Sequence, residues 1–220
     1  YSWLAPTVAG ISGTAPGTNQ TSFNSGTLVN STNAPIDVQY TVTPRYTNNA
    51  VMCEGTPFTV TVTVNPKPVI ADTATTTCSG QAFTVTPTGI GSNIVPSGVR
   101  YSWNPPTVTG GMTGGASGTN ATSITGTLTN PTSTDQTAVY TVTPRYTNNG
   151  VMCEGTSFTV TVTVNPRPAI GAYTTTICTG TAHTFTPLNG QPTSATIVPV
   201  GTLYSWLAPT VAGISGTAPG

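Results

Sequence analysis

Hydrophobic and polar residues alternate one by one along several short stretches of the chain. The clearest stretch is 158–164, FTVTVTV, in which Phe158 and three valines share one side of an extended backbone and three threonines share the other. Such period-two alternation predicts a β-strand with one buried face. The stretches 82–88 (AFTVTPT) and 138–143 (AVYTVT) show the same pattern. Each is expected to turn its Phe, Val or Tyr side inward.

Seven strands, which we letter A to G, are predicted within residues 67–166. They lie in 68–77, 82–88, 99–103, a short segment near 110–118, 121–129, 138–143 and 158–164. The tripeptide NNG at 148–150 suits a tight turn between strands F and G. Twenty prolines and 24 glycines, spread along the chain, leave no long stretch for a helix. The fold class is therefore predicted to be all-β.

The strand pattern repeats along the chain. Residues 40–66 and 140–166 are identical at 25 of 27 positions, at an offset of 100. The tripeptide YSW occurs at 1–3, 101–103 and 204–206. Self-similarity at a fixed period indicates tandem structural units. A unit of about 100 residues is the size of one β-sandwich domain.

The chain also has a second, longer repeat period. Residues 1–17 and 204–220 are identical, whereas the copy that begins at Tyr101 differs strongly after YSW. The chain is therefore interpreted as a two-domain unit that repeats every 203 residues. We expect the parent protein to continue past Gly220 with TNQTSF or a close variant.

Two short proline segments separate the predicted domains. The sequences NPKP at 65–68 and NPRP at 165–168 each follow the last strand of a unit. Proline cannot donate to a strand ladder and stiffens the backbone, so these segments are expected to be short, semi-rigid linkers. The predicted organisation is a partial repeat with strands C to G (1–66), a complete repeat (67–166) and strands A to C of a third repeat (167–220).

Aromatic residues at equivalent positions of these units are predicted to form their cores. They are Trp3, Trp103, Trp206, Tyr40, Tyr140, Phe58 and Phe158. Burying one Phe or Val side chain contributes roughly 1.5–3 kcal/mol. About 15 inward residues per domain are then enough for an independently stable unit without a metal or a disulfide.

Charge and composition exclude several classes of protein. The chain has five basic and five acidic residues, so its formal net charge is zero and it cannot neutralise a nucleic-acid backbone. No run of 18 apolar residues is present that would span a membrane. About 50 threonines, few charges and four cysteines without metal-type spacing favour an oxidising location, secreted or at the cell surface.

Candidate catalytic and metal-binding residues are too few and too scattered to build a site. His183 is the only histidine and aligns with Phe83 of the preceding unit, so a strand residue is expected there. Calcium needs six to eight oxygen ligands, and a triad or carboxylate pair cannot be assembled from residues that recur. The glycine-rich segment 110–118 has no GK[ST] and is expected to be a loop. We expect no enzyme activity, catalytic residue, metal or cofactor.

One charged pair recurs. Arg45 and Glu54 reappear as Arg145 and Glu154, on either side of the F–G turn. They are placed to pair across that turn, where a surface ion pair contributes roughly 0–1 kcal/mol. The alternative is a contact between the ends of neighbouring domains.

Several motifs together resemble the polycystic-kidney-disease-like (PKD-like), immunoglobulin-like repeats of very large secreted proteins. The resemblance lies in YSW of strand C, YTVTP of strand F and the terminal TVTVTVNPxP. Such repeats are abundant in surface adhesins of Bacteroidota. Similar sequences continue YSW into an acidic WDFGDG turn, whereas Trp3, Trp103 and Trp206 are followed by LAP, NPP and LAP. The resemblance implies tandem seven-stranded immunoglobulin-like β-sandwiches with a role in adhesion or filament building.

The four cysteines are the most informative polar residues. Cys53 and Cys153 lie near the F–G turn, and Cys78 and Cys178 lie just before strand B. Three pairings are open: across the linkers (Cys53–Cys78 and Cys153–Cys178), within one domain (Cys78–Cys153), or between the A–B cysteine of one domain and the F–G cysteine of the next. The immunoglobulin-like topology puts these turns at opposite ends of a strand about 23 Å long, while a disulfide needs Cα atoms within about 7 Å. The first two pairings are therefore strained, and free thiols remain a fourth outcome.

These observations favour a structural, non-catalytic role as the shaft of an extracellular filament or a cell-surface adhesin. Copies of the same chain are the expected partners, packed end to end and side by side, because a nearly uncharged surface has little repulsion to keep them apart. One alternative is a glycan- or surface-binding module that uses the loops at 104–118. Another is a spacer domain of a larger secreted enzyme.

Overall fold

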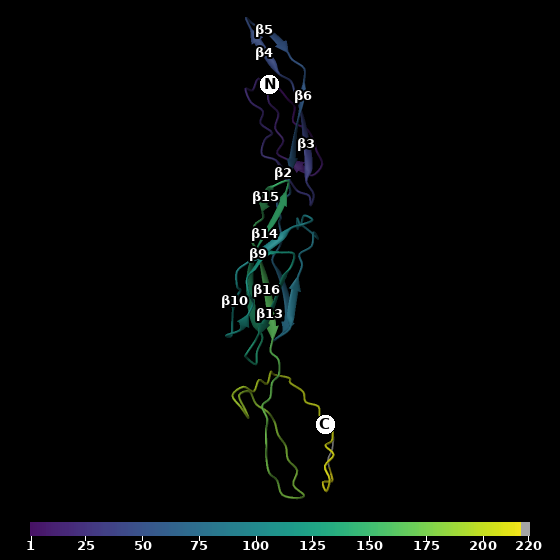
Figure 1. The fold of residues 1–220 in the computed structure, drawn as a ribbon, viewed down its shortest axis with the longest axis vertical. Coiled ribbons are helices and arrows are strands. Elements are labelled where there is room, and N and C mark those ends of the chain that lie inside the picture. The colour runs from purple at the N-terminus through teal and green to yellow at the C-terminus, as the bar shows by residue number, and fades with distance from the viewer. Residues whose placement is uncertain (217–220) are drawn as a thin grey trace.

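The chain is elongated, and its three parts follow one another along the long axis (Figure 1). The computed structural model describes residues 1–216, in which strands are present and no helix occurs. This confirms the all-β fold class. Within this range no helix is long and apolar enough to cross a membrane.

The middle part, residues 67–166, contains two packed sheets. The larger sheet has the order β12-β9-β14-β16-β7, and β10 and β15 also pair with β14. The smaller sheet has the order β11-β13-β8. The strands are β7 (Thr73–Cys78), β8 (Ala82–Val85), β9 (Arg100–Trp103), β10 (Thr107–Val108), β11 (Thr113–Gly114), β12 (Gly118–Ala121), β13 (Ile124–Thr129), β14 (Gln136–Asn148), β15 (Val151–Glu154) and β16 (Phe158–Asn165). This arrangement is the immunoglobulin-like sandwich.

The core of this complete repeat lies between the two sheets. Along β16, Phe158 is 2% exposed and the three valines that alternate with threonine are fully buried, as the alternation predicted. Tyr140 and Val142 of β14 are buried beside them. From the smaller sheet, Phe83, Ile124 and Leu128 close the core. Its stability comes from apolar side chains that the pleat directs to one face of each strand.

The first and last strands of the complete repeat run parallel to each other. Residues 73–78 of β7 pair in register with residues 160–165 of β16. The strand pairs in the complete repeat are otherwise antiparallel. The chain therefore enters this repeat at the end where β16 begins and leaves it at the opposite end.

Several strands differ from their predicted bounds: the predicted strand B ends earlier, at Val85, and the predicted strand F is longer, from Gln136 to Asn148. The predicted strand A starts later, at Thr73, and Val69 before it forms an isolated bridge with Ile94. The predicted strand E is split: β12 pairs with β9 in the larger sheet, whereas β13 pairs with β8 in the smaller one. A bend at residues 122–123 carries the chain from one sheet to the other. Alternation alone does not reveal such a change of sheet.

The first part, residues 1–66, keeps the same registers with fewer strands. Its strands are β1 (Ile11–Ser12), β2 (Val29–Asn30), β3 (Ile36–Val42), β4 (Arg45–Asn48), β5 (Val51–Glu54) and β6 (Phe58–Val64). They pair as β1 with β2, β3 with β6 and β4 with β5. Trp3 and Tyr40 are buried, at 5% and 1% exposed.

Phe58 departs from the predicted core. Its side chain is 45% exposed, whereas that of Phe158 is 2% exposed. Residues 1–66 have no counterpart of β7, which lies beside β16 in the larger sheet, or of β8, which belongs to the sheet packed across the core. The face of β6 is therefore only half-buried.

The third part also departs from the prediction. Residues 167–216 form no strand, although strands A to C were expected there. Only isolated bridges occur among them, and the bridge of Ala169 with Ile197 repeats that of Val69 with Ile94. Trp206, predicted to be in the core, is 57% exposed. In the complete repeat strands A to C pair with strands E, F and G, which have no counterpart in residues 167–216.

The predicted F–G turn is present and links β14 to β15. Asn149 and Gly150 have φ values of 48° and 76°, as a two-residue type I′ hairpin turn requires. In the first repeat the same positions are Asn49 and Ala50, with φ values of 46° and 64°. An alanine at positive φ costs roughly 1–2 kcal/mol that a glycine does not.

The two hairpins therefore predict opposite responses to exchange of this residue. We expect Ala50→Gly to slow amide hydrogen exchange in β4 and β5, and Gly150→Ala to speed it in β14 and β15, each by roughly 5- to 30-fold. The measurement is hydrogen exchange followed by mass spectrometry of peptides from each hairpin. Unchanged exchange in both variants would contradict the assignment of a strained turn.

Candidate functional site

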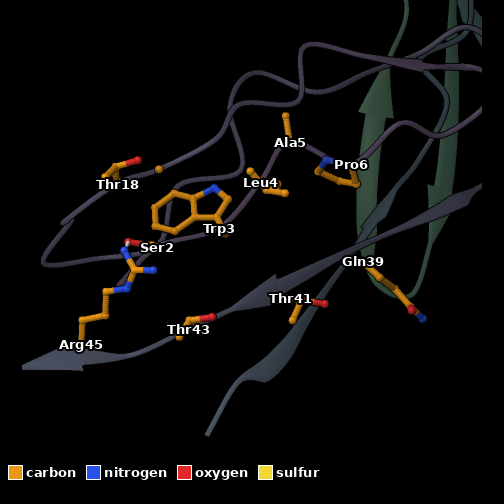
Figure 2. A pocket seen from close by; sticks show the side chains of 11 residues that line it. Ser2, Trp3, Leu4, Ala5, Pro6, Thr18, Gln39, Thr41, Thr43 and Arg45 are labelled. Atoms are coloured by element: carbon orange, nitrogen blue, oxygen red, sulfur yellow. Dashed lines mark hydrogen bonds between the residues drawn. The ribbon is translucent and has the colours of Figure 1, made fainter. Parts of the chain in front are cut away.

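A shallow pocket lies beside the threonine face of the sheet in both of the first two repeats. Its volume is about 540 Å³ in the first repeat and about 360 Å³ in the second. Figure 2 shows the first pocket, with Ser2 and Trp3 side by side on one side of it and Thr41 and Thr43 on the other. The lining positions recur as Ser2 and Ser102, Trp3 and Trp103, Thr18 and Thr119, Thr41 and Thr141, Thr43 and Thr143, and Arg45 and Arg145.

The indole at this pocket is used to hold the repeat together. The Nε1–H of Trp3 donates to the Ala15 carbonyl at 2.9 Å, and that of Trp103 donates to the Ala116 carbonyl at 3.1 Å. Gly118 lies flat on the Trp103 ring, where an added Cβ would come within 2.2 Å of a ring carbon. Both indoles are also buried. The ring therefore presents neither a free N–H group nor an exposed face to a ligand.

The recurring charged pair forms as expected across the F–G hairpin. Arg45 Nη2 lies 2.7 Å from Glu54 Oε1, and Arg145 Nε lies 2.8 Å from Glu154 Oε2. The two members of each pair are opposite each other in the strand register. Their side chains are about a third to a half exposed, so each pair orders the hairpin without contributing much stability.

The titratable side chains in the described part of the chain do not gather into a reactive cluster. No group of three or more His, Cys, Asp or Glu residues there is placed to hold a metal ion. His183 stacks on Tyr173, with ring centroids 5.7 Å apart, and Tyr173 stacks on Phe185 at 4.0 Å. His183 is exposed and lies outside any strand. The pocket itself offers hydroxyl groups and an arginine already paired with glutamate.

One buried polar group has a strongly shifted ionisation. The Tyr101 side chain is 1% exposed, and its hydroxyl has no hydrogen-bond partner among the described residues. Burial raises the pKa of Tyr101 to about 12 and also raises the pKa of Tyr140. These hydroxyls lie in the core, so they report on folding rather than on ligand binding.

The junction between the first and second repeats is a second candidate site. Asn148 Nδ2 donates to Asn65 Oδ1 at 2.8 Å, and Asn65 Nδ2 donates to the Asn148 carbonyl at 3.4 Å. On another side, Asn33 Oδ1 accepts from the Val95 amide at 2.6 Å. The F–G hairpin of one repeat therefore lies against the end of strand G of the repeat before it.

The junction buries residues that are exposed where no preceding repeat is described. Tyr146 is 8% exposed, while its equivalent Tyr46 is 68% exposed. The linker prolines Pro66 and Pro68 are buried as well. Gly155 fits against the Pro68 carbonyl, where an added Cβ would come within 2.2 Å of the oxygen. The linker is thus packed into the base of the hairpin, as a semi-rigid connection requires.

The four cysteines lie at the ends of repeats, and all are free in this structure. Cys78 ends β7 beside Asn165, at the exit end of the complete repeat. Cys153 lies in β15 opposite Tyr146, at the entrance end. Cys53 and Cys178 are exposed, and Cys153 is half-buried. The structure therefore brings no two cysteines of the described chain together.

The junction asparagines were not among the residues singled out from the sequence. A usable signal exists for two of them, because Asn65 and Asn148 lie within the 27-residue segment that is almost unchanged between repeats. Both look like ordinary turn or linker residues, which hides their role. Asn33 has no such signal, since its equivalent is Ser133.

The fold and its junction define a class of protein: an array of immunoglobulin-like β-sandwich modules joined end to end. Residues 1–68 and 75–168 match the family described as PKD-like domain, and the chain belongs to this family. No curated protein and no solved structure matches the chain. PKD-like domains are typically extracellular structural or spacer modules and are generally non-catalytic.

The buried phenol predicts a loss of stability in alkaline solution. Above pH 10, the unfolded chain releases the Tyr101 proton more readily than the folded chain, whose Tyr101 pKa is about 12. The free energy of unfolding should therefore fall as pH rises from about 10 to about 12. Denaturant unfolding at several pH values measures this. Tyr101→Phe should make the fall shallower, whereas Tyr46→Phe, at an exposed position, should leave it unchanged.

The junction predicts unequal thiol reactivity. In variants that keep one cysteine, we expect maleimide to label Cys53 several-fold faster than Cys153, because Cys53 is exposed and Cys153, beside the junction, is half-buried. Asn65→Ala should speed labelling of Cys153 and leave Cys53 unchanged. Equal rates in both single-cysteine variants would show that the junction is open in solution.

Proposed function

We propose that the chain is part of the shaft of an extracellular filament or cell-surface adhesin, of the kind that its resemblance to Bacteroidota adhesin repeats implies. Its repeats act as spacers that transmit tension without catalysing a reaction. The observation that carries this proposal is the parallel pairing of the first and last strands of the complete repeat over residues 73–78 and 160–165.

Parallel terminal strands resist pulling along the chain. Tension applied at the two linkers draws β7 toward the entrance end of the repeat and β16 toward its exit end. The six register pairs between them are then loaded together, in shear, and not one after another. A module pulled in this direction must break the whole ladder before its core opens. This geometry suits a shaft that holds a cell to a surface.

The surface chemistry fits packing between copies of the same protein. The outward side chains of β16 and of its counterpart β6 are threonines, and the whole chain has only ten charged residues. Such a surface has little repulsion and little dependence on salt. The proposed partners are therefore copies of the chain, in series and side by side.

A glycan-binding role receives less support. The repeated pocket contains a tryptophan, but its indole N–H is already bonded to backbone and its ring is covered by glycine. The loop at 104–118 contributes buried Met112 and no aromatic residue. Ligand sites usually combine a few polar groups with apolar or aromatic side chains, and these loops have exposed hydroxyl groups but no exposed aromatic face.

Force spectroscopy on single chains tests the shear proposal. With handles at the two ends of the chain, we expect Thr76→Pro in β7 to lower the unfolding force of the complete repeat, because proline disrupts the β7–β16 ladder. Thr127→Pro in β13, equally exposed but outside that ladder, is the matched control and should lower the force less. Equal force losses would contradict a shear-loaded pair.

Imaging tests the filament itself. Electron microscopy of cells that produce the parent protein should show thin surface fibres with a spacing that matches one repeat. Cells with a bare surface, together with a purified chain that stays monomeric at high concentration, would remove the filament proposal and leave the spacer role.

A further inference from the structure

The two cysteines of the complete repeat are too far apart to bond with each other. Thr77, the residue before Cys78, pairs with Val164 of β16. Val164 in turn pairs with Gln136 of β14. Cys153 pairs with Tyr146, which lies ten residues after Gln136 in β14. Ten residues of strand span about 33 Å, and a disulfide needs Cα atoms within about 7 Å. A disulfide between Cys78 and Cys153 of one repeat is therefore excluded as long as the sheet is folded.

Cys78 is held firmly at the exit end of its repeat. The next residue, Ser79, is buried, and its amide donates to the Asn165 carbonyl at 2.9 Å. Its hydroxyl donates to the Asn130 carbonyl at 3.3 Å and accepts from the Asn130 amide at 2.9 Å. These bonds fix the A–B turn beside the last residue of β16, and the Cys78 side chain remains exposed.

This same place is where the following repeat docks. At the junction that the structure contains, the asparagine that ends strand G is Asn65, the equivalent of Asn165. It is bonded to Asn148 in the F–G hairpin of the next repeat. Cys78 is thus beside Asn165, and the F–G hairpin of a following repeat is beside the equivalent residue, Asn65. In an array of complete repeats, the two would meet at one asparagine.

The hairpin cysteine is on the side that faces this junction. Residues opposite each other in an antiparallel pair project from the same face, and Cys153 is opposite Tyr146. Tyr146, in the hairpin that bonds to Asn65, is 8% exposed, while Tyr46, before which no repeat is described, is 68% exposed. The face that carries Cys153 is therefore the face that the preceding repeat covers.

We propose that the A–B cysteine of each repeat forms a disulfide with the F–G cysteine of the repeat that follows it. In a tandem array with the 203-residue period, Cys78 bonds the Cys53 of the following copy, and Cys178 bonds the Cys153 of that copy. One 220-residue chain holds only one half of each such pair. The bond requires only that complete repeats follow one another.

The chemistry is oxidation by thiol–disulfide exchange. The two thiols lose two protons and two electrons, and a sulfur–sulfur bond forms between them. The electrons and protons pass to a small-molecule disulfide, whose own bond breaks to give two thiols. Such oxidants belong to the secretory and extracellular setting in which PKD-like domains are usually found.

The bond would change how tension passes along the shaft, a consequence that rests on the proposed function. Force entering at the linker would run along β7 to Cys78 and cross directly to the next repeat. Force arriving at Cys153 would run along β16 to the next linker. Residues 79–152, which include most of the core, would carry no load. The array would then resist extension even when a repeat unfolds.

Disulfide mapping on two copies in series tests the pairing. The copies are joined in frame at the duplicated segment, so no foreign sequence is added. Serine replaces Cys53 and Cys153 in the first copy and Cys78 and Cys178 in the second. After treatment with oxidised glutathione, proteolysis and mass spectrometry should find Cys78 bonded to the second copy's Cys53, and Cys178 to its Cys153.

A reversed variant provides the control. It keeps Cys53 and Cys153 in the first copy and Cys78 and Cys178 in the second, so that no A–B cysteine precedes a hairpin cysteine across a junction. No internal disulfide is expected in it. The proposal is overturned if the first variant bonds Cys178 to the second copy's Cys53, within one repeat, or if its thiols stay free or carry only glutathione.

The same variant, pulled from its ends, separates the disulfide from the shaft. With reductant, each complete repeat should lengthen the chain by about 300 Å when it unfolds, since roughly 100 extended residues replace one folded module. After oxidation these steps should disappear. Mapped disulfides without surface fibres on cells would end the shaft proposal and leave the disulfide. Free thiols, together with an unfolding force that depends on the β7–β16 ladder, would end the disulfide proposal and leave the shaft proposal.

Discussion

The parallel pairing of β7 with β16 is the interaction on which the rest of the structure depends. It adds the first strand to the sheet that carries the last one, so that strand G has a partner on both sides and is not at the edge of the sheet. Where this strand is missing, in residues 1–66, Phe58 is 45% exposed, against 2% for Phe158. The same pairing sends the chain in at one end and out at the other. The place of strand G within its sheet and the direction of the repeat axis both follow from it.

Local pattern predicted the strands well and their partners less well. The alternation in 158–164 assigns the buried face of β16 correctly, because a strand's side chains alternate whatever it pairs with. Burial depends on the partner. The segment YSW is the same at 1–3 and 204–206, yet Trp3 is 5% exposed and Trp206 is 57% exposed. Ser2 and Trp3 bridge to Thr43 and Gly17, next to the folded strands of their repeat, whereas the described residues 167–216 form no strand.

The candidate site was predictable to a similar degree. The repeat period and the immunoglobulin-like topology were enough to place the cysteines at opposite ends of a unit and to pair Arg145 with Glu154. The contacts between units were not, because asparagine in a turn or linker usually satisfies its own backbone. The roles of Asn65 and Asn148 appear only when two repeats are seen together. A contact between modules does not produce a repeating pattern of hydrophobic and polar residues within either module.

The contacts identified between the first and second repeats are weak. A neutral hydrogen bond contributes only about 0.5–1.5 kcal/mol, and the bonds identified between the repeats are two from the Asn65–Asn148 pair and one from Asn33. Relative motion is the default for modules joined this lightly. Surface charge cannot stiffen the junction either, since the chain has only ten charged residues. The packed prolines limit bending but do not prevent it. A straight shaft of such modules, as proposed, would need a bond that side-chain packing and hydrogen bonding cannot supply. The cysteines at the two ends of the complete repeat would supply it through the proposed disulfide.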